Sequence, residues 1–96
     1  MGLQQILQEK RQEILEIAAK HGAYNIRIFG SVARGEADDD SDVDFLIDAG
    51  PNRTPFFPGG LVRDLESLLG RPVDVVTEKG LRSRIRERVL NEAVPL

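Results

Sequence analysis

Apolar residues along the chain fall into runs with two kinds of spacing. In the first twenty residues they recur every three or four positions, which predicts a helix over about residues 3–20 that stops before Gly22. A second helical pattern begins at Leu61 and stops at Gly70, and a third covers about residues 81–93. These patterns predict three amphipathic helices.

Three shorter apolar runs have the length of strands. They cover residues 26–29, 43–47 and 72–76, and the middle run is apolar at successive positions, which is typical of a central strand covered on both faces. A brief helical turn follows the first run, and residues 51–60, with three prolines and two glycines, are expected to form a loop. The order of elements predicts an α/β fold with a small three-stranded mixed sheet flanked by helices.

The length and charge of the chain narrow the possibilities further. Its 96 residues are enough for a single domain, residues 1–96, with a core over about residues 24–78. The formal charge of −3 gives no long-range attraction to nucleic acid or anionic lipid, so neither direct DNA binding nor a membrane partner is expected. Cysteine is absent, which fits a reducing compartment, and we expect a cytoplasmic protein.

The acidic stretch before the middle strand contains the first candidate chemistry. Six carboxylates lie between Glu36 and Asp44, and apolar residues follow at once. Asp42 and Asp44 point to the same side of an extended chain with their Cα atoms about 7 Å apart, and Asp74 interrupts the next apolar strand. If these strands are neighbours, three carboxylates share one site. Such a cluster opposes folding unless a hard divalent cation such as Mg²⁺ or Mn²⁺ compensates the charge.

The residues after the first strand predict an anion site beside these carboxylates. Gly30 permits a tight turn, and Ser31 can offer its hydroxyl and neighbouring N–H groups to a phosphate. Arg34 lies on the same face of the short helix and can reach the same phosphate. The alternatives are that Ser31 only caps the helix and that Arg34 is only a surface charge.

The motif Gly30-Ser31, ten residues and then Asp42-x-Asp44, with a lone Asp74 in a later strand, resembles the nucleotidyltransferases with a DNA polymerase β-like fold. More closely, the segments GSVARGEADDDSDVDFLID and LLGRPVDVV are similar to the minimal nucleotidyltransferases, which occur beside HEPN-domain partners as toxin–antitoxin pairs. The resemblance covers roughly residues 24–90.

This resemblance implies transfer of a nucleoside monophosphate from an NTP, with ATP preferred. It implies that Asp42 and Asp44 hold two Mg²⁺ ions, and that Asp74 helps to bind one of them and accepts the proton of the attacking hydroxyl. Ser31 is implied to hold the terminal phosphates. The resemblance to the antitoxins of this family further implies that the acceptor is a tyrosine hydroxyl of the partner, a HEPN ribonuclease that AMP addition silences.

Two other functions remain open at this stage. The 96 residues leave no room for the base-recognition and primer-gripping domains of larger relatives. A partner protein or an oligomer is therefore expected to complete the substrate-binding site. The chain could instead neutralise its partner by occlusion, through Phe56, Phe57 and exposed apolar surface of the terminal helices, with the metal site idle or regulatory. It could also be a small-molecule enzyme resembling the aminoglycoside nucleotidyltransferases, completed by a second domain in another chain.

Several other residues are given structural roles. His21, at a helix end, is expected to face water and to take no part in catalysis. Phe56 and Phe57 either plug the core or form an exposed patch. A solvated loop is expected for Glu36, Asp38, Asp39 and Asp40, and a solvated helix face for Arg82, Arg84, Arg86 and Arg88.

Overall fold

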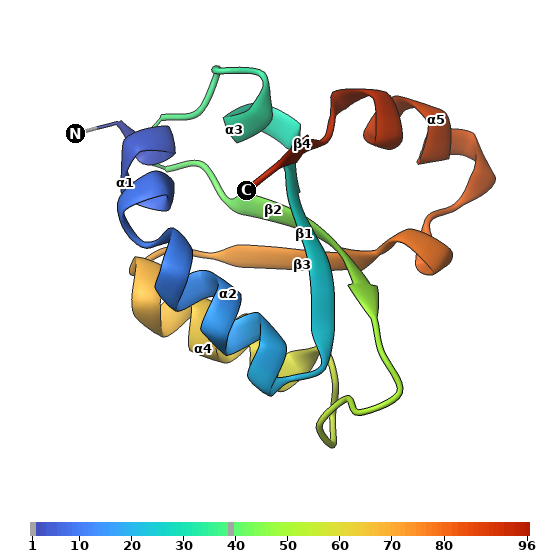
Figure 1. The fold of residues 1–96 in the computed structure, drawn as a ribbon. Coiled ribbons are helices and arrows are strands. Elements are labelled where there is room, and N and C mark those ends of the chain that lie inside the picture. Colours follow the sequence, from blue (N-terminus) through green and yellow to red (C-terminus); the bar gives the residue numbers. More distant parts are fainter. Residues whose placement is uncertain (1, 39) are drawn as a thin grey trace.

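The computed structural model describes residues 2–38 and 40–96, so Asp39 of the acidic loop lies outside the described residues. Within this part of the chain, helices pack against a four-stranded mixed sheet (Figure 1). The elements are α1 (Leu3–Glu9), α2 (Arg11–Lys20), β1 (Ala23–Phe29), α3 (Gly30–Ala33), β2 (Val43–Ala49), α4 (Gly59–Leu69), β3 (Val73–Thr77), the 3₁₀ turn η1 (Glu78–Gly80), α5 (Ser83–Glu92) and β4 (Val94–Pro95). The predicted α/β class is confirmed.

The order of strands in the sheet is β3-β2-β1-β4. β1 is antiparallel to both β2 and β4, whereas β2 and β3 are parallel. The sheet therefore has one strand more than predicted. The extra strand β4 consists of Val94 and Pro95 alone, and two residues carry no alternating pattern that a sequence-based argument can detect.

The N-terminal region forms two helices rather than the single helix predicted over residues 3–20. The break is at Lys10, whose backbone angles of φ −100° and ψ 11° leave the helical region. The apolar spacing continues through the break, so Leu7 and Ile14 are both buried. The break lets α1 reach α3, where the Gln4 amide donates a hydrogen bond of 2.8 Å to the Val32 carbonyl.

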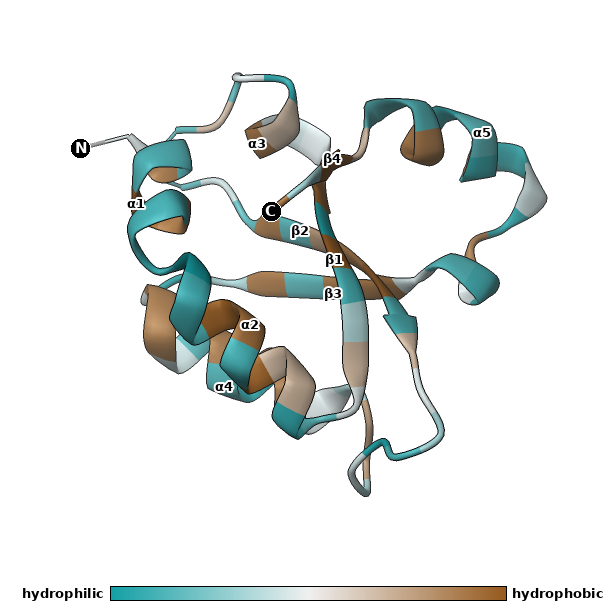
Figure 2. Cartoon of the chain, viewed as in Figure 1, coloured by the Kyte–Doolittle hydropathy of each residue, from teal (hydrophilic) through white to brown (hydrophobic). Residues whose placement is uncertain are grey.

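β2 is the central strand, as predicted, and its alternate side chains enter two different cores. Val43, Phe45 and Ile47 pack with residues of α1, α2 and α4 on one face of the sheet. Leu46 packs on the other face against Leu81 and Val89. Figure 2 shows that α5, which covers this second face, is mostly hydrophilic. α5 spans residues 83–92, slightly less than the predicted 81–93, because Leu81, Arg82 and Ala93 have extended backbone angles.

The loop between β2 and α4 treats its two phenylalanines differently. Phe57 packs against the larger core, whereas Phe56 is 93% exposed. The Arg53 guanidinium lies 6.0 Å from the centre of the Phe57 ring, within the range of a cation–π contact. One phenylalanine thus anchors the loop and the other is displayed on its surface.

No helix in the described part of the chain is long and apolar enough to cross a membrane.

His21 is buried rather than facing water as expected. Its Nδ1 lies 2.7 Å from the Thr54 hydroxyl, and its Nε2 lies 2.7 Å from a carboxylate oxygen of Asp64. The imidazole therefore joins the end of α2 to the 50–58 loop and to α4. The prediction of a solvated ring failed because both partners are more than thirty residues away in sequence.

Candidate active site

Gly30 forms the turn between β1 and α3 with a positive φ of 75°. A Cβ atom at this position would overlap the Oδ2 atom of Asp44, so only glycine lets the backbone pass this close to the carboxylate. The next residue, Ser31, lies in α3 and is partly buried. The turn therefore places the predicted anion-binding backbone directly against the predicted metal ligand.

Asp44 and Asp74 are paired across the two parallel strands. They are register partners, and each is the second residue of its strand. On the other side, Phe29 at the end of β1 is the antiparallel partner of Asp44. One edge of the sheet thus gathers the starts of β2 and β3 and the end of β1. The expected adjacency of the two acidic strands is confirmed.

The pKa of Asp44 reflects its partial burial and the excess of negative charge at this edge of the sheet. Partial burial, followed by repulsion from Asp74, Asp42 and Glu92, raises the pKa of Asp44 to about 6 from its ordinary 3.8. The Arg34 guanidinium opposes this shift only weakly. Negative charge at this edge is therefore undercompensated by the chain itself, which is the electrostatic condition that a bound cation relieves.

Oxygen ligands of this kind fit a hard divalent cation. The side chains are not arranged as a preformed metal site, because no three acidic or histidine side chains among residues 2–38 and 40–96 are grouped as a metal cluster. Asp42 and Asp74 are exposed, and Asp44 is half-buried. The two strands are neighbours, as expected. The three carboxylate side chains are not grouped closely enough, among the described residues, to form one metal site.

An open cleft of about 470 Å³ lies beside Asp44. It is lined by Phe29, Gly30, Ser31, Arg34, Asp40, Asp42, Asp44, Arg88 and Glu92. Five of the six predicted site residues therefore share one cleft, and Asp74 lies outside its lining. Asp40 is exposed, as predicted for the acidic loop, but it also faces this cleft.

Two residues of α5 complete the cleft and were not predicted as site residues. Arg88 was assigned to a solvated helix face, and it is exposed, yet it lines the cleft. Glu92 accepts hydrogen bonds from the Gly30 N–H at 2.8 Å and from Arg34 Nη1 at 2.6 Å. These bonds, the one from Arg34 above all, hold the pKa of Glu92 below its usual range. The only sequence signal was that residues 88 and 92 lie one helical turn apart.

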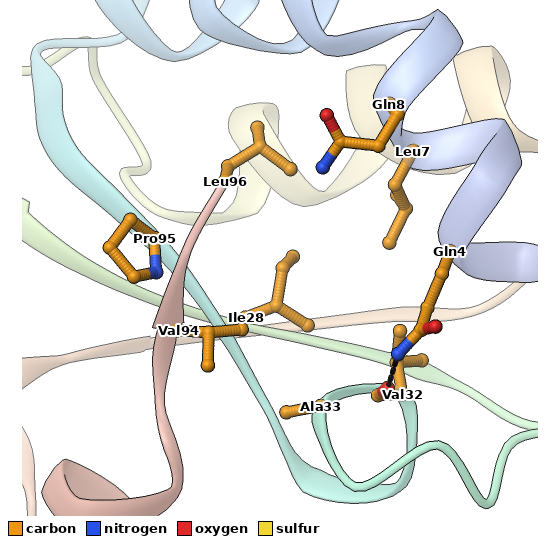
Figure 3. A pocket seen from close by; sticks show the side chains of 9 residues that line it. All are labelled: Gln4, Leu7, Gln8, Ile28, Val32, Ala33, Val94, Pro95 and Leu96. Atoms are coloured by element: carbon orange, nitrogen blue, oxygen red, sulfur yellow. Dashed lines mark hydrogen bonds between the residues drawn. The ribbon is translucent and has the colours of Figure 1, made fainter.

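A second cavity of about 250 Å³ lies on the other side of α3 (Figure 3). Leu7, Ile28, Val32 and Val94 are among its apolar walls, and at one side of it the Gln4 amide donates a hydrogen bond to the Val32 carbonyl. Its lining, within the described part of the chain, includes no charged side chain. This pocket has no acid or base for catalysis, whereas the cleft beside Asp44 contains five of the predicted site residues and is the candidate active site.

Known proteins resemble this chain over most of its length. Residues 7–96 match the family described as the nucleotidyltransferase domain. The chain is 40% identical over 94 residues to the protein adenylyltransferase MntA of Thermococcus cleftensis, covering 96% of this chain and 90% of that protein. A Methanocaldococcus jannaschii relative named for the same activity is 38% identical over 88 residues, covering 92% of this chain and 95% of that protein.

Solved structures give the same result for the fold. A structure described as a minimal nucleotidyltransferase is 49% identical, has a TM-score of 0.85 and covers 100% of this chain and 97% of its own. A toxin–antitoxin structure containing AMP-PNP has a TM-score of 0.74 at 21% identity, covering 88% of this chain and 69% of its own. At that identity the second likeness concerns the fold alone.

Proposed function

The chain belongs to the nucleotidyltransferase domain family and is an enzyme of that type, and from this premise we propose that it moves AMP from ATP to a hydroxyl group of a partner protein. The observation that carries the proposal is the arrangement at one edge of the sheet. The Gly30 turn touches Asp44, Asp44 is paired with Asp74, and the cleft beside them contains Ser31 and Arg34.

Each residue has a role in this proposal. Ser31, the Gly30 backbone and Arg34 bind and orient the terminal phosphates through hydrogen bonds and charge. Asp42, Asp44 and Asp74 are the residues that would hold Mg²⁺, with Mn²⁺ as a substitute and with two ions implied by the family resemblance. When bound, the metal ions neutralise charge on the phosphates and activate the phosphoryl group.

The chemical step is an in-line displacement at the α-phosphorus. The acceptor oxygen forms a bond to this phosphorus, and the bond from phosphorus to the bridging oxygen of pyrophosphate breaks. The electron pair of that bond leaves with pyrophosphate. Asp74 takes the proton from the acceptor hydroxyl, which is consistent with its exposed position beside Asp44, where an incoming protein can reach it.

The acceptor that we propose is a toxin, and the chain is then its antitoxin. The name of the T. cleftensis relative supports protein modification, and similarly folded chains come from toxin–antitoxin structures. The family resemblance adds that the toxin is a HEPN ribonuclease modified on a tyrosine. An open cleft with an exposed proton acceptor fits a protein substrate that itself closes the site.

The test is incubation of the protein with Mg²⁺, ATP labelled at the α-phosphate, and an extract of its own cells. A labelled protein band is expected with the wild type and with Glu13→Gln, which removes an exposed carboxylate far from the cleft in sequence. The band should be absent with the Asp42→Ala/Asp44→Ala double variant. Equal labelling by the double variant would refute the site.

Occlusion of a partner remains the second candidate, because Phe56 is almost fully exposed on the 50–58 loop. A large exposed aromatic side chain is a typical anchor in a protein interface. This alternative expects Phe56→Ser to abolish neutralisation of the toxin and the Asp42→Ala/Asp44→Ala variant to preserve it. The opposite pair of results supports the enzyme.

A further inference from the structure

Among the described residues that line the cleft, Glu92 is the carboxylate that the predicted anion donors bind. One of its oxygens accepts the Gly30 N–H at 2.8 Å, and the other accepts Arg34 Nη1 at 2.6 Å. Its side chain is only 14% exposed, although the Arg34 side chain is 45% exposed. An internal anion therefore occupies two donors that the sequence assigns to phosphate.

The geometry of this contact is that of anion binding. A carboxylate bonded to both a backbone N–H and a guanidinium makes two charge-assisted hydrogen bonds, the kind that phosphate oxygens also accept. Arg88, one turn earlier on α5, lines the same cleft and lowers the pKa of Glu92 further, after Arg34 and Gly30. Arg34 and Arg88 thus provide local positive charge for an anion in a cleft that is otherwise acidic, and the chain itself supplies that anion as Glu92.

The same carboxylate is unfavourable for the neighbouring acids. Glu92 is among the charges that raise the pKa of Asp44. An added triphosphate would meet this negative charge at the donors it needs. Glu92 and a phosphate group cannot both take the Gly30 N–H, because that group offers one hydrogen.

We infer that Glu92 is an internal competitor that occupies the phosphate donors in the free protein and releases them when the nucleotide binds. This inference rests on the proposed function, since it assumes that a triphosphate enters this cleft. Because Glu92 must first be displaced, the affinity for the nucleotide is lower than it would be if Gly30 and Arg34 were free to bind it. It also keeps Arg34 ordered in the free protein, bonded to Glu92 and to Glu36.

The exchange needs only a rotation of the Glu92 side chain. β4 follows one residue after Glu92, and Val94 is paired with Ile28 of β1, close to Gly30. The backbone at the end of α5 is therefore fixed to the strand that leads into the cleft. The released carboxylate can turn toward Arg88, which is exposed one helical turn away.

The experiment measures the dissociation constant of the Mg²⁺ complex of a non-hydrolysable ATP analogue, and of Mg²⁺ tripolyphosphate, by calorimetry. Glu92→Gln should bind both probes about fivefold more tightly than the wild type, as expected for loss of a competing ion pair. The matched control is Glu87→Gln, which removes the same charge from an exposed position of the same helix and should leave both constants unchanged.

Equal or weaker binding by Glu92→Gln, with the wild type binding normally, would overturn this inference and leave the proposed function standing. Absence of binding by the wild type and by both variants would overturn the proposed function and the inference with it. If Glu92→Gln fails to fold, Glu92→Asp serves instead, because its shorter side chain cannot span both donors. The NMR signal of the Gly30 amide should shift on addition of tripolyphosphate to the wild type, and an unmoved signal in a protein that binds would also refute the exchange.

Discussion

Asp44 and Asp74 are direct partners in the parallel register of β2 and β3, each one residue inside its strand. Parallel strands that start at the same edge bring residues at equal positions side by side. The two carboxylates repel each other, and they are tolerated in otherwise apolar strands because neither is fully buried. Both lie at the solvent edge of the sheet, where an ion or a substrate can reach them.

Asp44→Asn should reduce nucleotidyl transfer by about 1,000-fold or more, since it removes a metal ligand from the reacting centre while keeping the shape of the side chain. The fold should be intact by circular dichroism. The measurement is label transfer from α-labelled ATP at saturating Mg²⁺. Transfer within tenfold of the wild type would show that Asp44 is not essential.

The contribution of Asp44 to the stability of the metal-free protein should fall as the pH rises from about 4 to about 6. The folded-state pKa of Asp44 is raised to about 6, so the folded protein holds a proton that the unfolded chain releases near its ordinary pKa of 3.8. Protonated Asp44 stabilises the fold below that range, and the advantage is lost above it. Allowing for solvent screening, the loss is roughly 1 kcal/mol.

Urea unfolding in EDTA at a series of pH values checks this dependence. Asp44→Asn, which carries no titrating group at this position, should lack the step and should be more stable than the wild type at pH 7. A step of equal size in the variant would assign the titration to another residue.

Mg²⁺ should raise the melting temperature of the wild type by about 5 °C at saturation, because an ion that binds the folded state alone stabilises it. The Asp42→Ala/Asp44→Ala variant should show no such rise. Scanning calorimetry with and without Mg²⁺ provides the comparison, and an equal rise in both proteins would place the ion elsewhere.

Gly30→Ala should abolish transfer and destabilise the protein, whereas Gly35→Ala should cost stability alone. Both glycines have a positive φ, 75° and 74°, so alanine strains the backbone by about 1 kcal/mol in each. Only at Gly30 does the added Cβ collide with Asp44, whereas at Gly35 it meets open space. Urea unfolding of both variants measures the cost of backbone strain, and transfer assays show the effect of the collision with Asp44. Full activity in Gly30→Ala would contradict this account.

His21→Ala should lower the free energy of unfolding by about 2 kcal/mol and leave transfer nearly unchanged. The ring joins α2 to Thr54 and Asp64 through two bonds of 2.7 Å, and it does not line the cleft. Urea unfolding and the transfer assay test the two halves of this prediction. A large loss of transfer in a folded variant would give His21 a role in the chemistry.

The sequence predicted the parts of the site that lie within short stretches. Asp42 and Asp44 are two residues apart, and Asp74 stands out in an apolar strand, so alternation and strand adjacency were enough to relate them. Gly30 was predicted from the need for a tight turn, which its positive φ bears out.

The rest of the cleft depends on how α5 is oriented. The contact between Glu92 and Gly30 spans 62 positions, and no periodicity of α5 says which of its charged residues faces the β1 turn. The break at Lys10 was missed because no glycine or proline marks it. Its cause lies in tertiary packing, since α1 reaches α3 only after the chain has bent.

The 50–58 loop leaves the carboxyl end of β2, five residues beyond Asp44 and so about 17 Å along the strand. Because the chain has no cysteine, Asn52→Cys on this exposed loop would provide a sole thiol for a fluorescent dye. Energy transfer from that dye to a fluorescent nucleotide would report binding of the nucleotide in the cleft. Quenching of the dye by a docking protein would report binding of the partner. A single labelled protein would then give the order in which the two bind.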